Sequence, residues 1–169
     1  MADEIVNRVA NSQLKTIDLE ELYPQGTRTT IDIKNWLFQE LILKETEFRE
    51  HLKNHDWGQY KNHFVALTCS SDAIIPSWAF MLITTYVFPF SKKVVVGNLT
   101  TLETSIFHDI ITHLNIEAYK NKPVIIKGCA NKPIPETAYI QLIEKLQPIA
   151  KSIMFGEACS TVPLFKRIN

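Results

Sequence analysis

The stretch Phe64-Val-Ala-Leu-Thr-Cys-Ser-Ser-Asp72 decides the fold, because it joins a short apolar run directly to a polar loop. Runs of this kind, rich in β-branched or aromatic residues and ending in Cys, Ser, Gly or Asn, are typical of β-strands. The same pattern returns three more times along the chain, at intervals of about thirty residues. We therefore predict four strands, at residues 64–68, 94–96, 124–126 and 153–155.

The segments between these strands are helix-like, each opened by a proline or a threonine. They cover residues 76–88, 99–119 and 135–150. A strand, a helix and a second strand at this spacing form a βαβ unit, whose right-handed crossover makes the two strands parallel. Strands that are apolar throughout indicate a sheet covered on both faces. We expect an α/β fold with a single doubly wound, mostly parallel sheet of four or five strands and helices on both faces. The fifth strand, within residues 162–168, would lie at an edge, where Pro163 is tolerated.

The chain has the size and composition of one domain, with 169 residues of which 46% are apolar. Within a single domain spanning residues 1–169, we interpret residues 1–30 as a lead-in segment that forms one strand or a short helix. Residues 31–169 then form the repeated strand–helix core. At the start of this core, Asp32 is placed to cap a long amphipathic helix that ends near Asn54.

Charge and hydropathy exclude several classes of protein. Lys and Arg together number 18, and so do Asp and Glu, so the net charge is zero and we expect no nucleic-acid partner. Residues 73–90 are uncharged, but Pro76 and Pro89 leave about a dozen helical residues, too few for a membrane span, and predict a buried helix instead. The odd number of cysteines and the start of the chain, which lacks the pattern of a secretion signal, indicate a cytoplasmic protein with reduced thiols.

The three cysteines are the informative residues. Cys69, Cys129 and Cys159 each lie just beyond the carboxyl end of a predicted strand, and the carboxyl ends of parallel strands meet at the edge where open sheets bind ligands. Their spacing keeps them in phase with the strand period. A strand order of 2-1-3-4 would make the three thiol-bearing strands neighbours, about 5 Å apart. Because thiolates are preferred ligands of zinc and of iron–sulfur centres, we expect these residues to bind a metal ion (zinc or iron) or a small iron–sulfur cluster.

Four polar residues are predicted near the thiols as supporting groups: Asp72, Lys127, Glu157 and Ser160. The first three have a structural or an incidental alternative. Asp72, with Ser71, would cap the helix that follows, Lys127 would extend its amine into solvent, and Glu157 would be a solvated loop charge. No histidine is predicted at this edge, so the fourth ligand stays open to water or substrate.

Two other functions remain compatible with the sequence, and whether the protein is an enzyme stays undecided. In the first, Cys69 is the nucleophile of a metal-free thiol enzyme or sulfur carrier, with its thiolate favoured by the N-terminus of the following helix. In the second, the protein is an interaction module and the cysteines are apolar packing residues.

Three segments resemble a bacterial family, domain of unknown function 2480, and the resemblance spans nearly the whole chain. They are Cys69-Ser-Ser-Asp-Ala-Ile-Ile-Pro-Ser-Trp78, Lys127-Gly-Cys129 and Gly156-Glu-Ala-Cys-Ser-Thr-Val-Pro-Leu164. Ala158 departs from the family pattern, which has proline there. The resemblance carries no established activity. It implies a link to iron–sulfur assembly, and therefore iron–sulfur assembly proteins as candidate partners beside a second copy of the chain.

Overall fold

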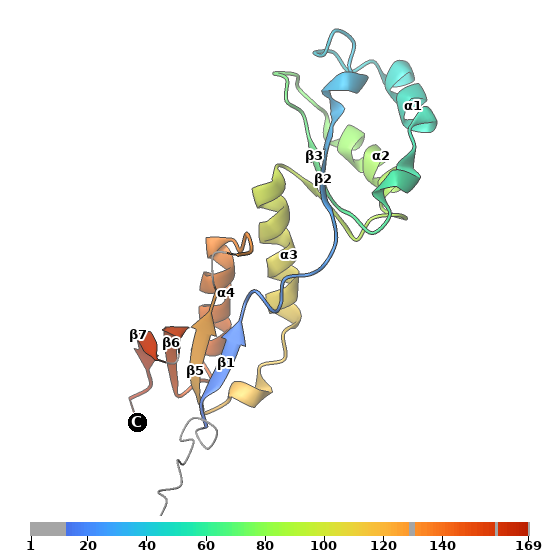
Figure 1. Ribbon diagram of the computed structural model, residues 1–169. Coiled ribbons are helices and arrows are strands. Elements are labelled where there is room, and N and C mark those ends of the chain that lie inside the picture. The colour runs from blue at the N-terminus through green and yellow to red at the C-terminus, as the bar shows by residue number, and fades with distance from the viewer. Residues whose placement is uncertain (1–12, 129–130, 158, 169) are drawn as a thin grey trace, which may run out of the picture. The chain divides into compact units, whose positions relative to one another are not determined.

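The computed structural model describes residues 13–128, 131–157 and 159–168, and it has a mixed α/β fold with two separate sheets (Figure 1). The chain divides into two compact units. Unit 1 comprises Met1–Tyr23 and Phe107–Asn169, and unit 2 comprises Pro24–Ile106. The prediction of an α/β fold is confirmed, whereas the prediction of a single sheet is wrong. That the chain forms one domain stays a prediction.

Unit 2 holds a three-stranded parallel sheet in the order β2-β3-β4. Its strands are β2 (Arg28–Asp32), β3 (Phe64–Thr68) and β4 (Lys93–Val96). Its helices are η1 (Ile33–Trp36), α1 (Glu45–Asn54), η2 (Trp57–Tyr60) and α2 (Ser77–Val87). Figure 1 shows α1 and α2 beside this sheet, and Phe48 of α1 and Ile83 of α2 are fully buried in one cluster with Leu67 of β3. This cluster is the hydrophobic core of unit 2.

Unit 1 holds a four-stranded sheet in the order β1-β5-β6-β7, parallel except for the last strand. Its strands are β1 (Lys15–Asp18), β5 (Pro123–Lys127), β6 (Ser152–Glu157) and β7 (Ser160–Lys166). Its helices are η3 (Glu117–Tyr119), α4 (Glu136–Leu146) and part of α3 (Leu99–His113), because the boundary between the units falls after Ile106. Leu142 of α4, Val124 of β5 and Ile153 of β6 are fully buried in one core cluster.

The two units contain a diverged sequence repeat, in which ten of the 38 aligned residues are identical. Residues 60–97 align without gaps to residues 119–156, each 59 positions later, with Tyr60 matching Tyr119 and Pro76 matching Pro135. The elements follow this offset, since β3, α2 and the start of β4 correspond to β5, α4 and the start of β6. The buried positions keep their character in both copies. They are Val65, Leu67, Ala79, Ile83 and Val87 in unit 2, and Val124, Ile126, Ala138, Leu142 and Leu146 in unit 1.

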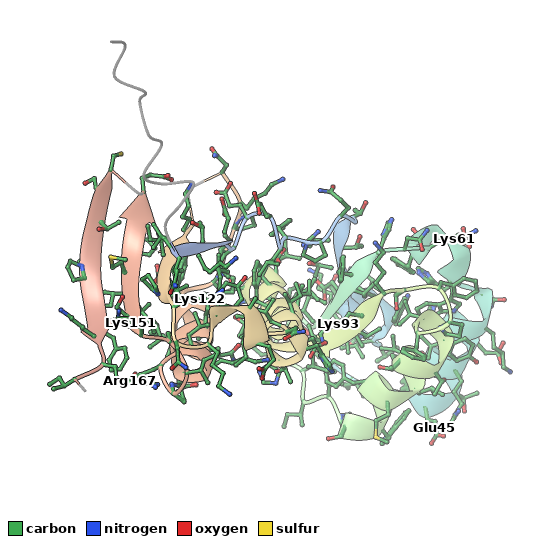
Figure 2. All side chains as sticks on the ribbon, turned by 90° about the horizontal axis from the view of Figure 1, so that it is seen from below. Glu45, Lys61, Lys93, Lys122, Lys151 and Arg167 are labelled. Atoms are coloured by element: carbon green, nitrogen blue, oxygen red, sulfur yellow. The ribbon has the colours of Figure 1, made fainter. Side chains whose placement is uncertain are left out.

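Backbone hydrogen bonds repeat with the same offset. The amide of Lys92 donates to the carbonyl of His63 at 2.7 Å, and the amide of Lys151 donates to the carbonyl of Lys122 at 2.9 Å. In unit 1 a further bond runs from the amide of Arg167 to the carbonyl of Lys151, so that the sheet is joined to the end of the chain at this edge (Figure 2). We infer that a lead strand followed by a βαβ unit is the building block of this protein, used once in each unit.

The lead-in segment explains why the chain forms two sheets instead of the predicted single sheet. It supplies β1 to one sheet and the first residues of β2 to the other, and each new strand ends in Thr-Ile-Asp, at Thr16–Asp18 and Thr30–Asp32. In the predicted order 2-1-3-4, β3 and β5 would have been neighbours. Instead, β2 occupies the free edge of β3 and β1 occupies the free edge of β5, so β3 and β5 do not pair with each other. That order is therefore wrong for β3 and β5, and correct for the neighbours β3 and β4 and for β5 and β6.

All four predicted strands are confirmed, and β7 is the expected edge strand and lies beside β6. The long helix from Asp32 is wrong: Gln39 and Glu40 have positive φ angles of 49° and 59° and turn the chain back, so that only Glu45–Asn54 is α-helical. Asp32 caps η1 instead. The helix predicted at 99–119 ends at His113, and residues 117–119 form η3.

The uncharged segment at residues 73–90 forms α2, which buries one face only. Ala79, Ile83 and Val87 are fully buried, whereas Met81 is 68% exposed. The prediction of a buried helix is therefore correct for one face of α2 only. Within the described part of the chain, no helix is both long and apolar enough to cross a bilayer.

Candidate functional site

Cys69 follows the last residue of β3 as predicted, but its environment is largely apolar. The side chain is partly buried and packs against the hydrophobic core of unit 2. Its Sγ lies 3.2 Å from the hydroxyl of Ser71. Free cysteine commonly packs as a small apolar residue, and this contact pattern favours that structural role for Cys69.

The loop after β3 is held by Asp32 at the end of the neighbouring strand. The Asp32 carboxylate accepts hydrogen bonds from the amide of Lys34 at 3.1 Å and from both the amide and the hydroxyl of Ser70. Burial by itself would raise the pKa of Asp32, but the hydrogen bonds from Ser70 and Lys34 outweigh it and hold the pKa below its ordinary value. An ionised Asp32 therefore orders the Cys69 loop.

Asp72 does not cap the helix that follows it. Pro76 is the N-cap residue of α2 and makes no side-chain cap hydrogen bond, and four residues separate Asp72 from Ser77, where the helix begins. Asp72 is exposed. Seven residues separate Cys69 from Ser77, so the helix N-terminus that the nucleophile hypothesis required is not next to this thiol in the sequence.

The carboxyl edge of β5 and β6 gathers the other predicted site residues. Lys127 and Glu157 are the last residues of these neighbouring strands, and their side chains form an ion pair at 2.7 Å between Nζ and Oε2. Ser160 begins β7 and pairs with Glu157 across the β6–β7 hairpin, and Cys159, in the connection between the two strands, is exposed. Cys129 lies outside the described residues. It follows Gly128, which comes directly after β5.

The thiol spacing does not match the internal repeat. The repeat offset is 59, so the counterpart of Cys69 is Gly128, and the counterpart of Cys129 is Ser70. The prediction that the thiols are in phase with the strands is therefore wrong by one residue. Among residues 13–128, 131–157 and 159–168, no group of three His, Cys, Asp or Glu side chains is arranged to hold a metal ion.

Sequence reasoning missed a cavity in unit 1. It has a volume of about 810 Å³ and lies between α4 and the β6–β7 hairpin, with Gly128 at the end of β5 in its wall. Its apolar lining is Ile134, Ile140, Ile143, Phe155, Val162 and Leu164, and its polar lining is Lys132, Glu136 and Tyr139. The Tyr139 and Phe155 rings meet edge to face, with centroids 5.8 Å apart.

Gly128 and Tyr139 are fitted to one another in the wall of this cavity. A Cβ atom on Gly128 would overlap the Tyr139 hydroxyl oxygen and lie 2.8 Å from its Cζ. Their counterparts in unit 2 are Cys69 and Phe80, a pair with a Cβ at the first position and no hydroxyl at the second. The internal repeat is the signal that could have revealed this site, because positions that differ between the two copies mark what is particular to unit 1.

The model of the family described as protein of unknown function (DUF2480) matches residues 3–167. The chain belongs to this family. The DUF2480 match covers both units and both copies of the internal repeat, and it confirms the resemblance carried by the cysteine segments. No curated protein and no solved structure matches the chain.

Proposed function

We propose that this DUF2480 protein binds a metal ion or a small iron–sulfur cluster through thiolates at the carboxyl edges of its sheets. The observation that supports the proposal most is that Cys129 and Cys159 follow neighbouring parallel strands, with Ile126 of β5 paired to Phe155 of β6. Adjacent strands lie about 5 Å apart, a separation that one metal ion or a small cluster can bridge.

Two features of this edge bear on thiolate ligands. Cys159 is exposed and therefore accessible to an incoming ion. Metal binding requires the deprotonated thiol, and the Lys127 ammonium lies at the end of β5, where its charge is offset by the Glu157 carboxylate 2.7 Å away. Glu157, paired to Lys127, orients that ammonium.

Cys69 is the least supported of the three proposed ligands, because it belongs to unit 2 and packs against an apolar core. Two thiolates alone do not complete a tetrahedral zinc or iron site. The remaining positions go to Cys69 in a three-thiolate site, or to cysteines of a second copy of the chain in a symmetric site. The proposal takes Cys129 and Cys159 as essential ligands in either case.

The test is metal content after purification without oxygen. Full-length protein and the variants Cys69→Ser, Cys129→Ser and Cys159→Ser are measured for zinc, iron and sulfide, with visible absorption and sedimentation in parallel. We expect stoichiometric metal that is lost in both Cys129→Ser and Cys159→Ser. Loss in Cys69→Ser as well identifies a three-thiolate site, whereas retention there with half a metal ion or half a cluster per chain and a dimeric mass identifies the symmetric one.

Metal-free protein, or unchanged metal in Cys129→Ser, contradicts the proposal. Metal-free protein with one thiol alkylated much faster than the others would favour the thiol enzyme or sulfur carrier. Slow and equal alkylation of all three thiols would favour the interaction module.

A further inference from the structure

We propose that the cavity of unit 1 binds a small molecule with an apolar body and one anionic group, such as a medium-chain carboxylate. The inference rests on side chains that the thiolate proposal does not use. It would stand if no metal were found.

The cavity has the size and character of a small-molecule site. A volume of about 810 Å³ lies within the range of roughly 300–1,000 Å³ that is usual for ligand pockets. Four of its apolar lining residues are left substantially exposed, namely Ile140 at 60%, Phe155 at 37%, Val162 at 59% and Leu164 at 52%. These side chains come from α4, β6 and β7, so elements of a single unit form a continuous apolar wall. An apolar ligand body would remove this surface from water.

The charges of the lining favour an anion. Lys132 is the one cation among the cavity residues. Its ammonium lies over the Tyr23 ring, 5.4 Å from the ring centroid. In the described part of the chain it has no carboxylate partner. Glu136 is the one anion. It belongs to the first turn of α4, whose partial positive charge offsets a carboxylate there. Lys132 is exposed and has no carboxylate partner in the described part of the chain, so an anionic ligand group in the cavity can pair with its ammonium.

The internal repeat shows that these features are particular to unit 1. The counterparts of Lys132, Glu136 and Tyr139 in unit 2 are Ala73, Ser77 and Phe80, none of which carries a charge or a phenolic hydroxyl. The buried core positions of the same two segments are alike in both copies. The polar lining of the cavity is therefore not needed for the fold that the two copies share, although other positions outside the buried core, such as Tyr86 and its counterpart Lys145, differ as well.

The test uses three ligands with the same tail: decanoate, 1-decanol and decylammonium. Each is titrated into the full-length chain by calorimetry below its aggregation threshold. We expect decanoate to bind about tenfold more tightly than 1-decanol, the effect of one charge-assisted contact, and decylammonium to bind most weakly. Lys132→Met should reduce decanoate affinity about tenfold and leave 1-decanol unchanged.

A matched pair of helix variants tests the location. Ile140→Gln, in the cavity wall, should weaken all three ligands, whereas Met81→Gln, at the counterpart position of α2 and 68% exposed, should weaken none. Both residues are exposed, so both variants should fold. Failure of decanoate to bind, equal effects of the two variants, or an unchanged head-group preference in Lys132→Met would overturn the proposal. A dimer that Ile140→Gln dissociates would overturn it as well, since a second copy would then occupy the cavity.

Discussion

The contact between Gly128 and Tyr139 gives a sharp prediction about stability. Replacing Gly128 by Ala places a Cβ on the Tyr139 hydroxyl, and that ring cannot move freely because it packs edge to face on Phe155. Overpacking of this kind costs about 1–3 kcal/mol. Gly128 does not have a positive φ, so Ala also restricts the unfolded chain and returns about 0.4–1 kcal/mol. We expect Gly128→Ala to lower the free energy of unfolding by about 1–2 kcal/mol.

The second half of this prediction is a rescue. In unit 2 the corresponding pair is Cys69 and Phe80, so the phenylalanine copy of this motif accommodates a Cβ. Tyr139→Phe alone should cost no more than about 1.5 kcal/mol, the contribution of one hydrogen bond. In the double variant the overlapping oxygen is gone, so we expect it to be more stable than the sum of the single effects by at least about 1 kcal/mol.

Urea unfolding followed by far-ultraviolet circular dichroism is the appropriate assay. All three tryptophans, Trp36, Trp57 and Trp78, belong to unit 2, so tryptophan fluorescence recorded in parallel reports on that unit alone. Gly58→Ala is the control, since a Cβ there approaches only the Asp56 carboxylate, at 3.2 Å, and should change stability by less than about 0.5 kcal/mol. If the effects of the Gly128 and Tyr139 variants were additive within about 0.5 kcal/mol, the steric reasoning would be refuted.

Two further predictions concern unit 2. Glu103→Gln should lower the free energy of unfolding, measured in urea, by about 2–4 kcal/mol, because the Arg28 and Glu103 side chains are 13% and 8% exposed and form an ion pair at 2.7 Å. The control is Glu47→Gln in an exposed ion pair, which should lower it by less than about 0.5 kcal/mol. Equal effects of the two variants would contradict this reasoning. Burial lowers the pKa of His55 below its ordinary 6.5, so the folded state binds fewer protons than the unfolded state. The free energy of unfolding should therefore fall as the pH drops below about 6.5. A His55→Gln variant with the same pH dependence as the unaltered protein would contradict this reasoning.

The strands were predictable from the sequence because each is a short run of apolar, mostly β-branched residues bounded by polar loop residues. β3 was predicted with its observed bounds, and the segments from Lys93, Pro123 and Ser152 were predicted within one or two residues. The helix predicted from Asp32 failed because its apolar spacing is helical while Gln39 and Glu40 adopt left-handed backbone angles. No composition rule forbids a helix at those two residues.

The candidate site was predicted in part. The sequence correctly placed Cys69 and Cys159 just after strands, because a strand ends where its apolar run ends. Glu157 was expected in the loop after Phe155 and is instead the last residue of β6. The Lys127–Glu157 ion pair and the cavity beside α4 were not predicted. The β5–β6 neighbours were predicted, but the ion pair depends on β6 extending to Glu157, and the cavity depends on how α4 packs beside the β6–β7 hairpin; neither is local information.

The sequence by itself determined the local elements and the repeat of 59 residues, because both are written in the order of apolar, polar and turn residues. Only the tertiary structure decided that the lead-in segment contributes to two sheets, and hence that Cys69 belongs to one unit and Cys159 to the other. The physical reason is that strand pairing is a competition between distant segments for the same backbone hydrogen bonds. β1 and β2, two short strands with the same Thr-Ile-Asp ending, occupy the edges beside β5 and β3 that would otherwise have been free to join.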